Sequence, residues 1–149
     1  MSAGASSSFW TPNCVKSILA DTGPLVALFK REDQHHKATV AWAEANTVRL
    51  LTTWPVLTES CHFLSREGKL CLFQFIEAGA VTVADISAAD LKGFANIMAK
   101  YTDRKVDLAD ASLVLLAEQS GATDIITIDR ADFSIYRLSR NRAFNILFP

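Results

Sequence analysis

Four acidic residues stand where apolar segments give way to a helix or a turn. They are Asp21, Glu59, Asp110 and Asp129, in the segments ILADTGPLVALF (18–29), LLTTWPVLTES (50–60), DLADASLVLLAE (107–118) and IITIDRADF (125–133). In a parallel α/β sheet such junctions lie along one edge, because every strand ends there. We therefore expect these four carboxylates to share one cleft.

Crowded carboxylates repel one another, so a divalent cation is their natural occupant. Ligands that are all oxygen favour Mg²⁺ or Mn²⁺ over zinc. A cation of this kind lowers the pKa of bound water and neutralises charge that develops on a phosphate, and two cations can act together. The acid set therefore suits phosphodiester hydrolysis, with either one metal ion or two.

Each acid also has a purely structural interpretation. Asp21 could cap a helix that has Pro24 in its first turn, and Glu59 could be a first-turn carboxylate favoured by the helix dipole. For a single acid this interpretation is the better one, but four acids at one edge of a sheet argue for a shared site.

Two neighbouring acids are better explained by structure than by chemistry. Asp107 and Asp110 have the spacing of a capping box, with Asp107 at the N-cap and Asp110 three residues later. Asp129 and Asp132 have the spacing and residue types of a turn. We interpret Asp107 as a cap and Asp132 as support for the turn, both assisting the four principal acids.

Strand-like and helix-like segments alternate along the chain. We expect strands at 15–20, 49–53, 80–84 and 124–128 with an edge strand at 143–147, and helices at 23–29, 33–46, 55–66, 69–79, 88–100 and 108–120. Such alternation predicts an α/β fold, a three-layer α/β/α sandwich with a mainly parallel central sheet. Residues 14–149 then form one domain behind a poorly ordered lead-in at residues 1–13.

Composition excludes several classes of protein. Of the 149 residues, 50% are hydrophobic and 21% are charged, which argues against disorder. The net charge of −1 excludes a polycation, so binding to nucleic acid needs a local basic patch. No apolar run reaches the roughly 18 residues of a membrane span, and we expect no membrane association.

The three cysteines, Cys14, Cys61 and Cys71, are an odd number without a CxxC pair. This pattern disfavours a disulfide framework or a zinc knuckle and fits a reducing cytoplasm. We interpret all three as small core residues. Trp42 and Trp54 are likewise interpreted as core residues.

Cations that could guide a polyanion to an acidic cleft form two groups. One group is Lys92, Lys100, Arg104 and Lys105, and the other is Arg130, Arg137, Arg140 and Arg142. The arginine group is the stronger candidate for binding RNA, because it is dense and Arg130 adjoins Asp129. A solvated helix face and a basic tail explain any single one of these residues equally well.

Taken in order, the segments LADTGPLVALF, TTWPVLTES, DLADASLVLLAE and IITIDRADF resemble the four acidic blocks of PIN-domain ribonucleases. The likeness is closest to VapC-type toxins of bacterial toxin–antitoxin pairs, and it runs from about Val15 to the C-terminus. It implies that the four principal acids bind Mg²⁺ or Mn²⁺ and carry catalysis, and that Thr22 and Thr127 are their hydroxyl neighbours.

The same resemblance implies endonucleolytic cleavage of RNA that leaves a 5′-phosphate and a 3′-hydroxyl. It also implies a homodimer and a cognate antitoxin protein. The segment 69–79 is apolar nearly all round, which predicts burial on both sides by the core or by such a partner.

Two other functions remain open from the sequence. An aspartyl-phosphate phosphohydrolase typically places a second Asp two residues after the nucleophile, where this chain has Gly23. A PIN-like scaffold could also bind RNA or protein without turnover, although its acid set would then have no use. His35 and His36 are adjacent, so on a helix they point about 100° apart and do not form one catalytic pair.

Overall fold

The computed structural model describes residues 16–148, so the expected lead-in at residues 1–13 lies outside the described part of the chain. Five strands form a central sheet in the order β3-β2-β1-β4-β7, and each neighbouring pair is parallel. The strands are β1 (Ser17–Ala20), β2 (Arg49–Thr53), β3 (Val81–Ala84), β4 (Asp124–Ile126) and β7 (Asn145–Ile146). The predicted parallel sheet is confirmed, including its C-terminal edge strand.

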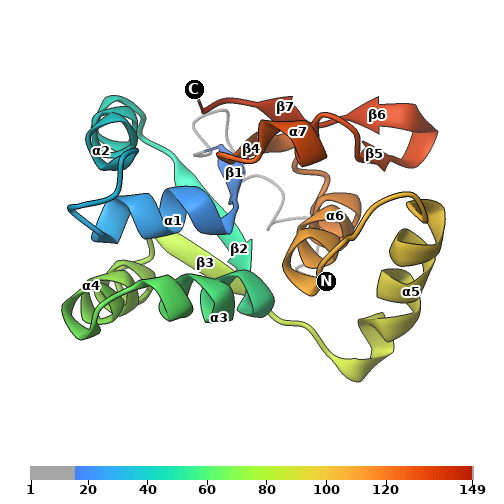
Figure 1. Ribbon diagram of the computed structural model, residues 1–149, viewed down its shortest axis with the longest axis horizontal. Coiled ribbons are helices and arrows are strands. Elements are labelled where there is room, and N and C mark those ends of the chain that lie inside the picture. The colour runs from blue at the N-terminus through green and yellow to red at the C-terminus, as the bar shows by residue number, and fades with distance from the viewer. Residues whose placement is uncertain (1–15, 149) are drawn as a thin grey trace, which may run out of the picture.

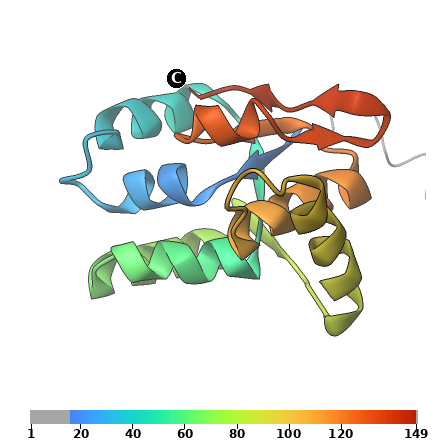
Figure 2. The ribbon, with the colours of Figure 1, turned by 45° about the vertical axis from the view of Figure 1, so that its right-hand side comes forward.

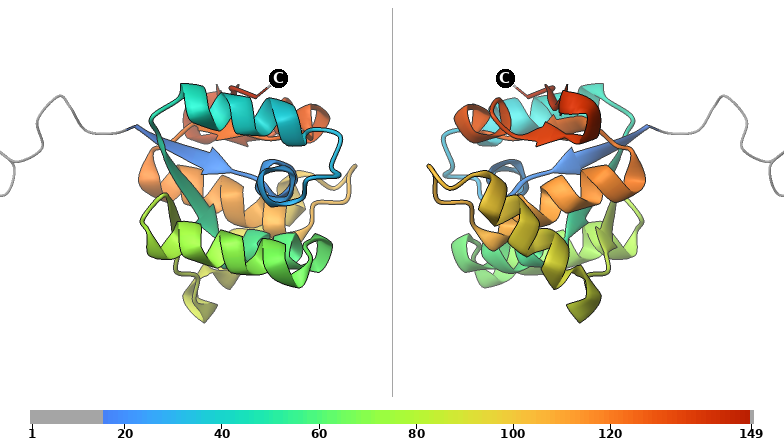
Figure 3. Two further views of the ribbon diagram at one scale, coloured as in Figure 1. Left: turned by 90° about the vertical axis from the view of Figure 1, so that its left-hand side faces the viewer. Right: turned by 90° about the vertical axis from the view of Figure 1, so that its right-hand side faces the viewer.

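Helices cover both faces of this sheet (Figure 1). One layer contains α1 (Thr22–Phe29), α2 (His36–Ala45), α3 (Trp54–Phe63) and α4 (Arg66–Glu77), and the other contains α5 (Leu91–Lys100) and α6 (Leu108–Ser120). The chain moves outward from β1 to β3 and then returns past β1 to β4. Right-handed crossovers in opposite directions place their helices on opposite faces, which gives the predicted three layers (Figures 2 and 3).

Local sequence explains where the helices begin and end. Asp21, Thr53, Ser65 and Asp107 each stand at an N-cap and accept a hydrogen bond from a backbone N–H of the first turn. Gly121 closes α6 in the left-handed conformation at φ 78°, as a C-terminal glycine should. These caps fix the starts of α1, α3, α4 and α6, of which α3 carries Glu59 and α6 carries Asp110.

One predicted helix begins later than expected. The segment 33–46 was predicted to be helical throughout, but α2 begins at His36. The Asp33 carboxylate accepts a hydrogen bond from the His35 backbone N–H at 2.8 Å, which holds these residues in a turn. Asp33 therefore competes with the helix for the backbone donors of its own neighbours.

The core lies on both faces of the central strands. Leu19 and Ile125, neighbours in register on β1 and β4, are completely buried, as is Leu113 on α6. Strands covered on both faces are expected to be apolar throughout. The residues interpreted as core include two errors: Trp54 is 52% exposed and Cys71 is also exposed, while Cys14 lies outside the described residues.

The region after β4 contains elements that the sequence did not predict. A short helix, α7 (Arg130–Phe133), leads to β5 (Arg137–Leu138), which pairs antiparallel with β6 (Arg142–Ala143). Residues Ser139–Asn141 join these two strands, and Arg140 and Asn141 both have positive φ. Within residues 16–148, no helix has the length and apolar character needed to cross a membrane.

Candidate functional site

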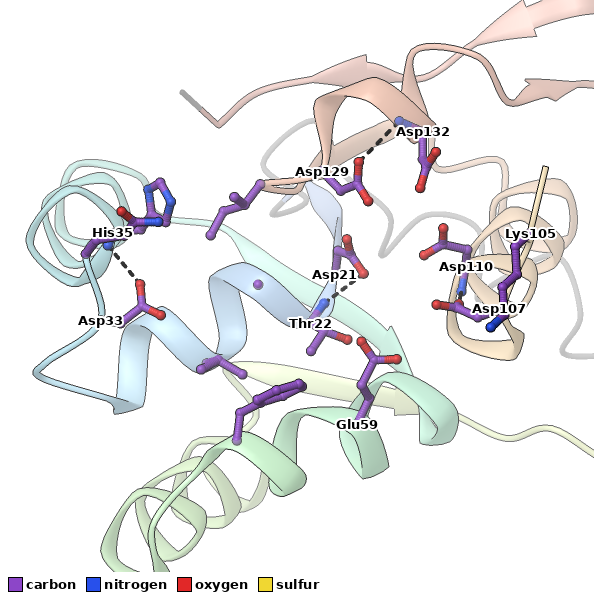
Figure 4. Close-up of a pocket in the computed structure, with 15 residues that line it drawn as sticks. Asp21, Thr22, Asp33, His35, Glu59, Lys105, Asp107, Asp110, Asp129 and Asp132 are labelled. Carbon is purple, nitrogen blue, oxygen red and sulfur yellow. Dashed lines mark hydrogen bonds between the residues drawn. The ribbon is translucent and has the colours of Figure 1, made fainter.

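The four predicted acids meet in one cleft at the carboxyl edge of the sheet. Asp21 follows β1, Glu59 projects from α3 after β2, Asp129 follows β4, and Asp110 lies in the first turn of α6. A cleft of about 590 Å³ is lined by all four, and Asp107, Asp132 and Lys105 also line it. Figure 4 shows the carboxylates of Asp21, Glu59, Asp110 and Asp129 directed towards a common space.

Asp21 lies deepest, with 7% of its surface exposed. Its Oδ1 accepts a hydrogen bond from the Thr22 backbone N–H at 2.8 Å, and its Oδ2 accepts one from the Thr127 hydroxyl at 2.7 Å. Burial, together with the negative charges of Glu59 and Asp129, raises the pKa of Asp21 to about 6, although these two hydrogen bonds act to lower it. Asp21 therefore caps α1 as well as facing the cleft.

Asp110 is half-buried on the opposite side of the cleft. The Tyr136 hydroxyl donates a hydrogen bond to Asp110 Oδ2 at 2.8 Å. Burial raises the pKa of Asp110 to about 7, with a further contribution from the negative charge of Asp21. In the described structure the Asp110 carboxylate makes no return bond to the N-cap, so only half of the expected capping box forms and this carboxylate faces the cleft.

Glu59 occupies the middle of α3, not its first turn. The structural interpretation of Glu59 as a first-turn residue stabilised by the helix dipole is therefore wrong. Its pKa is raised by partial burial and then by the negative charge of Asp107. Glu59 thus closes the side of the cleft between Asp21 and the start of α6.

Asp107, Asp129 and Asp132 line the cleft and also hold the local backbone in place. Asp107 is the N-cap of α6 and accepts a hydrogen bond from the Asp110 backbone N–H at 2.8 Å, as predicted. Asp129 caps α7 through the Asp132 backbone N–H at 3.3 Å. Asp132 forms an ion pair with Arg104 at 2.7 Å, which supports its predicted role in holding this turn.

The two predicted hydroxyl neighbours differ in their bonding. Thr127 donates to Asp21 and accepts a hydrogen bond from the Asp129 backbone N–H at 3.0 Å, so it joins two of the acids. The Thr22 hydroxyl is buried and makes no hydrogen bond of ordinary geometry within the described residues. It lies towards the Glu59 carboxylate, whose pKa it acts to lower, and Thr22 and Glu59 both line the cleft.

The cations are placed differently from the preference derived from sequence. Lys105 lines the cleft, whereas Arg130, Arg137, Arg140 and Arg142 are absent from its lining. The Arg130 and Arg137 guanidinium groups donate to backbone carbonyls of Phe148 and of Ser134 and Tyr136, respectively. Figure 4 shows Lys105 beside Asp107 and Asp110, at the opposite end of the cleft from His35.

The adjacent histidines have separate environments. His36 Nδ1 lies 2.6 Å from the Ala27 carbonyl oxygen, which ties the start of α2 to α1. His35 lines the cleft, whereas His36 does not. The structure therefore separates the two side chains, as their spacing predicted.

The donor set fits a hard divalent cation. All four principal side chains offer carboxylate oxygens, which Mg²⁺ and Mn²⁺ prefer. Burial and the negative charges of neighbouring acids raise the pKa of Asp21 and of Asp110, so a positive charge in the cleft would relieve an unfavourable arrangement. Among residues 16–148, no three Asp, Glu, His or Cys side chains are already gathered closely enough to enclose an ion.

Sequence reasoning missed two residues of this site. Tyr136 reaches Asp110 across 26 residues of chain, and no local pattern marks that contact. Phe63 stands one helical turn after Glu59, lines the cleft and is 55% exposed. Its spacing of four from Glu59 could have placed it on the same face of α3.

Comparison with known proteins gives concordant results. Residues 18–139 match the PIN domain family. The chain is 26% identical over 134 residues to Ribonuclease VapC26 of Mycobacterium tuberculosis, covering 87% of this chain and 99% of that protein. Its fold is similar to the crystal structure of Mycobacterium tuberculosis VapC20, a sarcin–ricin loop cleaving toxin, with a TM-score of 0.64, 17% identity and coverage of 72% of this chain and 86% of that one.

Proposed function

Because the chain belongs to the PIN domain family, we propose that it is a metal-dependent endoribonuclease and the toxin of a toxin–antitoxin pair. The observation that carries the proposal is the facing pair of carboxylates on the buried Asp21 and the half-buried Asp110, whose pKa values burial and neighbouring acids raise to about 6 and about 7. Similarity to a ribonuclease over most of both chains supports RNA as the substrate.

In this proposal Asp21 and Asp110 bind the cation directly, and Glu59 and Asp129 complete its oxygen ligands. A bound Mg²⁺ or Mn²⁺ would supply an activated water and neutralise charge on the phosphate. The Thr127 hydroxyl keeps Asp21 and the backbone of Asp129 in a fixed relation. The protein then needs no histidine as a general base.

The lining of the cleft supports an extended single-stranded substrate. Lys105 offers a positive charge to a phosphate at one end, and the exposed ring of Phe63 offers a face on which an unpaired base can stack. Arg130, Arg137, Arg140 and Arg142 would contact the strand only beyond the cleft. Their role is therefore to attract RNA rather than to position the cleaved bond.

The alternative of an aspartyl-phosphate phosphohydrolase meets a steric obstacle. A Cβ atom built at Gly23 would lie 3.0 Å from Ile128 Cδ1 and 3.1 Å from its Cβ. The acidic side chain that such enzymes place at this position would displace Ile128. The alternative of a binding module does not explain why two carboxylates with raised pKa values, those of Asp21 and Asp110, face the same cleft.

The test is cleavage of a 5′-labelled single-stranded RNA by the full chain in Mg²⁺, in Mn²⁺ and in excess EDTA. We expect internal cleavage that EDTA abolishes and added metal restores, with products ending in 5′-phosphate and 3′-hydroxyl. The Asp21→Asn variant, purified in the same way, excludes a contaminating nuclease.

Other outcomes point to the other functions. Cleavage that persists in EDTA and leaves 2′,3′-cyclic phosphate would contradict metal dependence and direct attention to His35. Hydrolysis of a small phosphate ester without cleavage of RNA would favour the phosphohydrolase. Retention of intact RNA at every metal concentration would favour the binding module.

The proposal includes partners, supported by the apolar surface of α4. Leu70 is 52% exposed, and Phe73 and Phe75 are also exposed, so this helix is not internal core as its composition allowed. A hollow of about 580 Å³ beside it is lined by Phe73, Trp54 and residues of the edge strand β3. Exposed apolar patches of this kind mark interaction sites, and we assign this one to a homodimer.

Light scattering at micromolar concentration tests the dimer. The wild-type chain should give twice the monomer mass, and Phe73→Glu should give the monomer mass while retaining its helical circular dichroism. A monomeric wild type would contradict the dimer assignment. A cognate antitoxin should bind the chain and suppress cleavage of the labelled RNA, and a co-expressed neighbouring gene product that does neither is not that antitoxin.

A further inference from the structure

One buried tyrosine makes direct contact with the acids. Tyr136 is 0% exposed, and its hydroxyl donates to Asp110 Oδ2 at 2.8 Å. Among the described residues, no other side chain donates a hydrogen bond to the Asp110 carboxylate. The orientation of Asp110 in the cleft therefore depends on this one contact.

The ring of Tyr136 is held on two sides. Tyr101 and Phe133 each pack edge-to-face against it, with ring centroids 5.2 Å away in both pairs. Phe133 is in turn packed against Phe144 at 5.4 Å. Because the ring cannot move without disturbing this cluster, its hydroxyl is a fixed point from which Asp110 is oriented.

Asp21 and Asp110 are thus fixed by different means. Asp21 has a donor on each oxygen, Thr22 N–H on one and Thr127 on the other. Asp110 has a donor on Oδ2 alone, which leaves its other oxygen free of protein donors in the described structure. A carboxylate held by one oxygen presents the other in a defined direction.

We propose that Tyr136 is a positioning residue that orients the Asp110 carboxylate for binding of the divalent cation. This inference rests on the proposed function, because it concerns the same site. Partners behind metal ligands of this kind fix ligand direction, and their loss typically costs about 10–100-fold in metal affinity or activity. A buried tyrosine also needs a partner for its own hydroxyl, so the test has to separate positioning from stability.

The chain offers a matched control in the same aromatic cluster. The Tyr101 hydroxyl accepts a hydrogen bond from the Arg137 backbone N–H at 2.7 Å and does not contact an acid of the cleft. Tyr136→Phe and Tyr101→Phe each remove one hydroxyl and one hydrogen bond while keeping the packed ring. Only Tyr136→Phe changes the environment of a proposed metal ligand.

The experiment measures Mn²⁺ affinity by calorimetry, melting temperature in EDTA, and kcat and KM for a labelled RNA. We expect Tyr136→Phe to weaken Mn²⁺ binding by about 10–100-fold and to lower kcat at limiting metal, with KM for RNA unchanged. Tyr101→Phe should melt lower in EDTA but bind Mn²⁺ as the wild type does. Excess Mn²⁺ should restore part of the kcat of Tyr136→Phe.

Equal Mn²⁺ affinity in Tyr136→Phe and wild type would overturn the inference, and so would equal losses in the two tyrosine variants. A double-mutant cycle separates positioning of Asp110 from a general loss of folded protein. In an Asp110→Asn background, Tyr136→Phe should cause no additional loss of Mn²⁺ affinity, and an additional loss would overturn the inference. A wild type that binds no metal and cleaves no RNA would instead contradict the proposed function.

Discussion

The acidic cleft contains two pairs of aspartates that use the same side chain for different purposes. Asp21 and Asp110 are buried or half-buried and receive hydroxyl donors from Thr127 and Tyr136, which lie 106 and 26 residues away. Asp107 and Asp129 are exposed, and their carboxylates accept hydrogen bonds from backbone N–H groups three residues along the chain. Long-range hydroxyl contacts and local caps therefore distinguish the two pairs.

The comparison shows how placement decides what an aspartate can do. A capping carboxylate in solvent stabilises its helix at little electrostatic cost. A buried carboxylate beside another acid is costly, and the raised pKa values of Asp21 and Asp110 are the sign of that cost. Proteins retain such costly arrangements chiefly at functional sites.

The largest effect should separate the two pairs by activity. Asp21→Asn and Asp110→Asn should each lower RNA cleavage by roughly 100-fold or more, because each removes a proposed ligand of the cation. Asp107→Asn and Asp132→Asn should retain most of the activity, since neither change removes a principal ligand. Initial rates on one labelled RNA at saturating Mg²⁺ check this, and a complete loss in Asp107→Asn would move that residue into the metal site.

Metal should also stabilise the wild-type fold. At 100 times the dissociation constant, a ligand that binds only the native state adds about 2.7 kcal/mol to the free energy of unfolding, which raises the melting temperature by roughly 5–10 °C in a chain of this size. Asp110→Asn should lose most of that rise, and Asp107→Asn should keep it. Melting curves with and without Mg²⁺ provide the measurement, and equal shifts in both variants would contradict the proposed difference between the two pairs of aspartates.

Without metal, the buried pair should give the protein an unusual dependence on pH. The folded pKa values of Asp21 and Asp110, about 6 and about 7, lie above the ordinary 3.8, so the native state binds more protons than the unfolded state between about pH 4 and 7. The free energy of unfolding contributed by this pair therefore rises as pH falls through that window.

Melting in EDTA should show this contribution as a gain of about 1–2 kcal/mol on going from pH 8 to pH 5, a range that allows for screening of the half-buried Asp110. Asp21→Asn should reduce the gain, and Asp107→Asn should leave it in place. If the free energy of unfolding depends on pH in the same way in the wild type and in Asp21→Asn, the pKa of Asp21 is not raised in the folded protein.

The smallest effect concerns the cap itself. Asparagine and aspartate cap helices equally well, so Asp107→Asn should leave the melting temperature nearly unchanged, whereas Asp107→Ala should cost about 0.5–2 kcal/mol. Cleavage at a temperature well below melting should be similar in both. A loss of activity in Asp107→Asn without a loss of stability would contradict the assignment of Asp107 as a cap.

Much of the fold and the acid set could be predicted because both depend on local signals. Each principal acid directly follows an apolar strand or lies on a helix that belongs to the crossover between two strands, and a parallel sheet brings such positions together without further information. The caps at Asp21 and Asp107 are also local, since their donors lie within three residues.

Other features could not be predicted because they depend on which faces meet. The apolar segment of α4 resembles that of α6, yet α6 is enclosed between the sheet and α5 while α4 leaves Leu70 and Phe73 exposed. Trp54 and Cys71 were placed in the core for the same reason and are exposed. The strands β5 and β6 have two residues each, too short for any periodicity to show.

The position of β1 has a consequence for synthesis of the protein. β1 pairs with β2 on one side and with β4 on the other, and the Thr127–Asp21 contact closes a loop of 106 residues. A chain emerging from the ribosome can complete the first pairing early, but it cannot form the second until β4 at Asp124–Ile126 has been made. The two pairings of β1, and with them the acidic cleft around Asp21, are therefore incomplete in a growing polypeptide until the residues of β4 and Asp129 have been made.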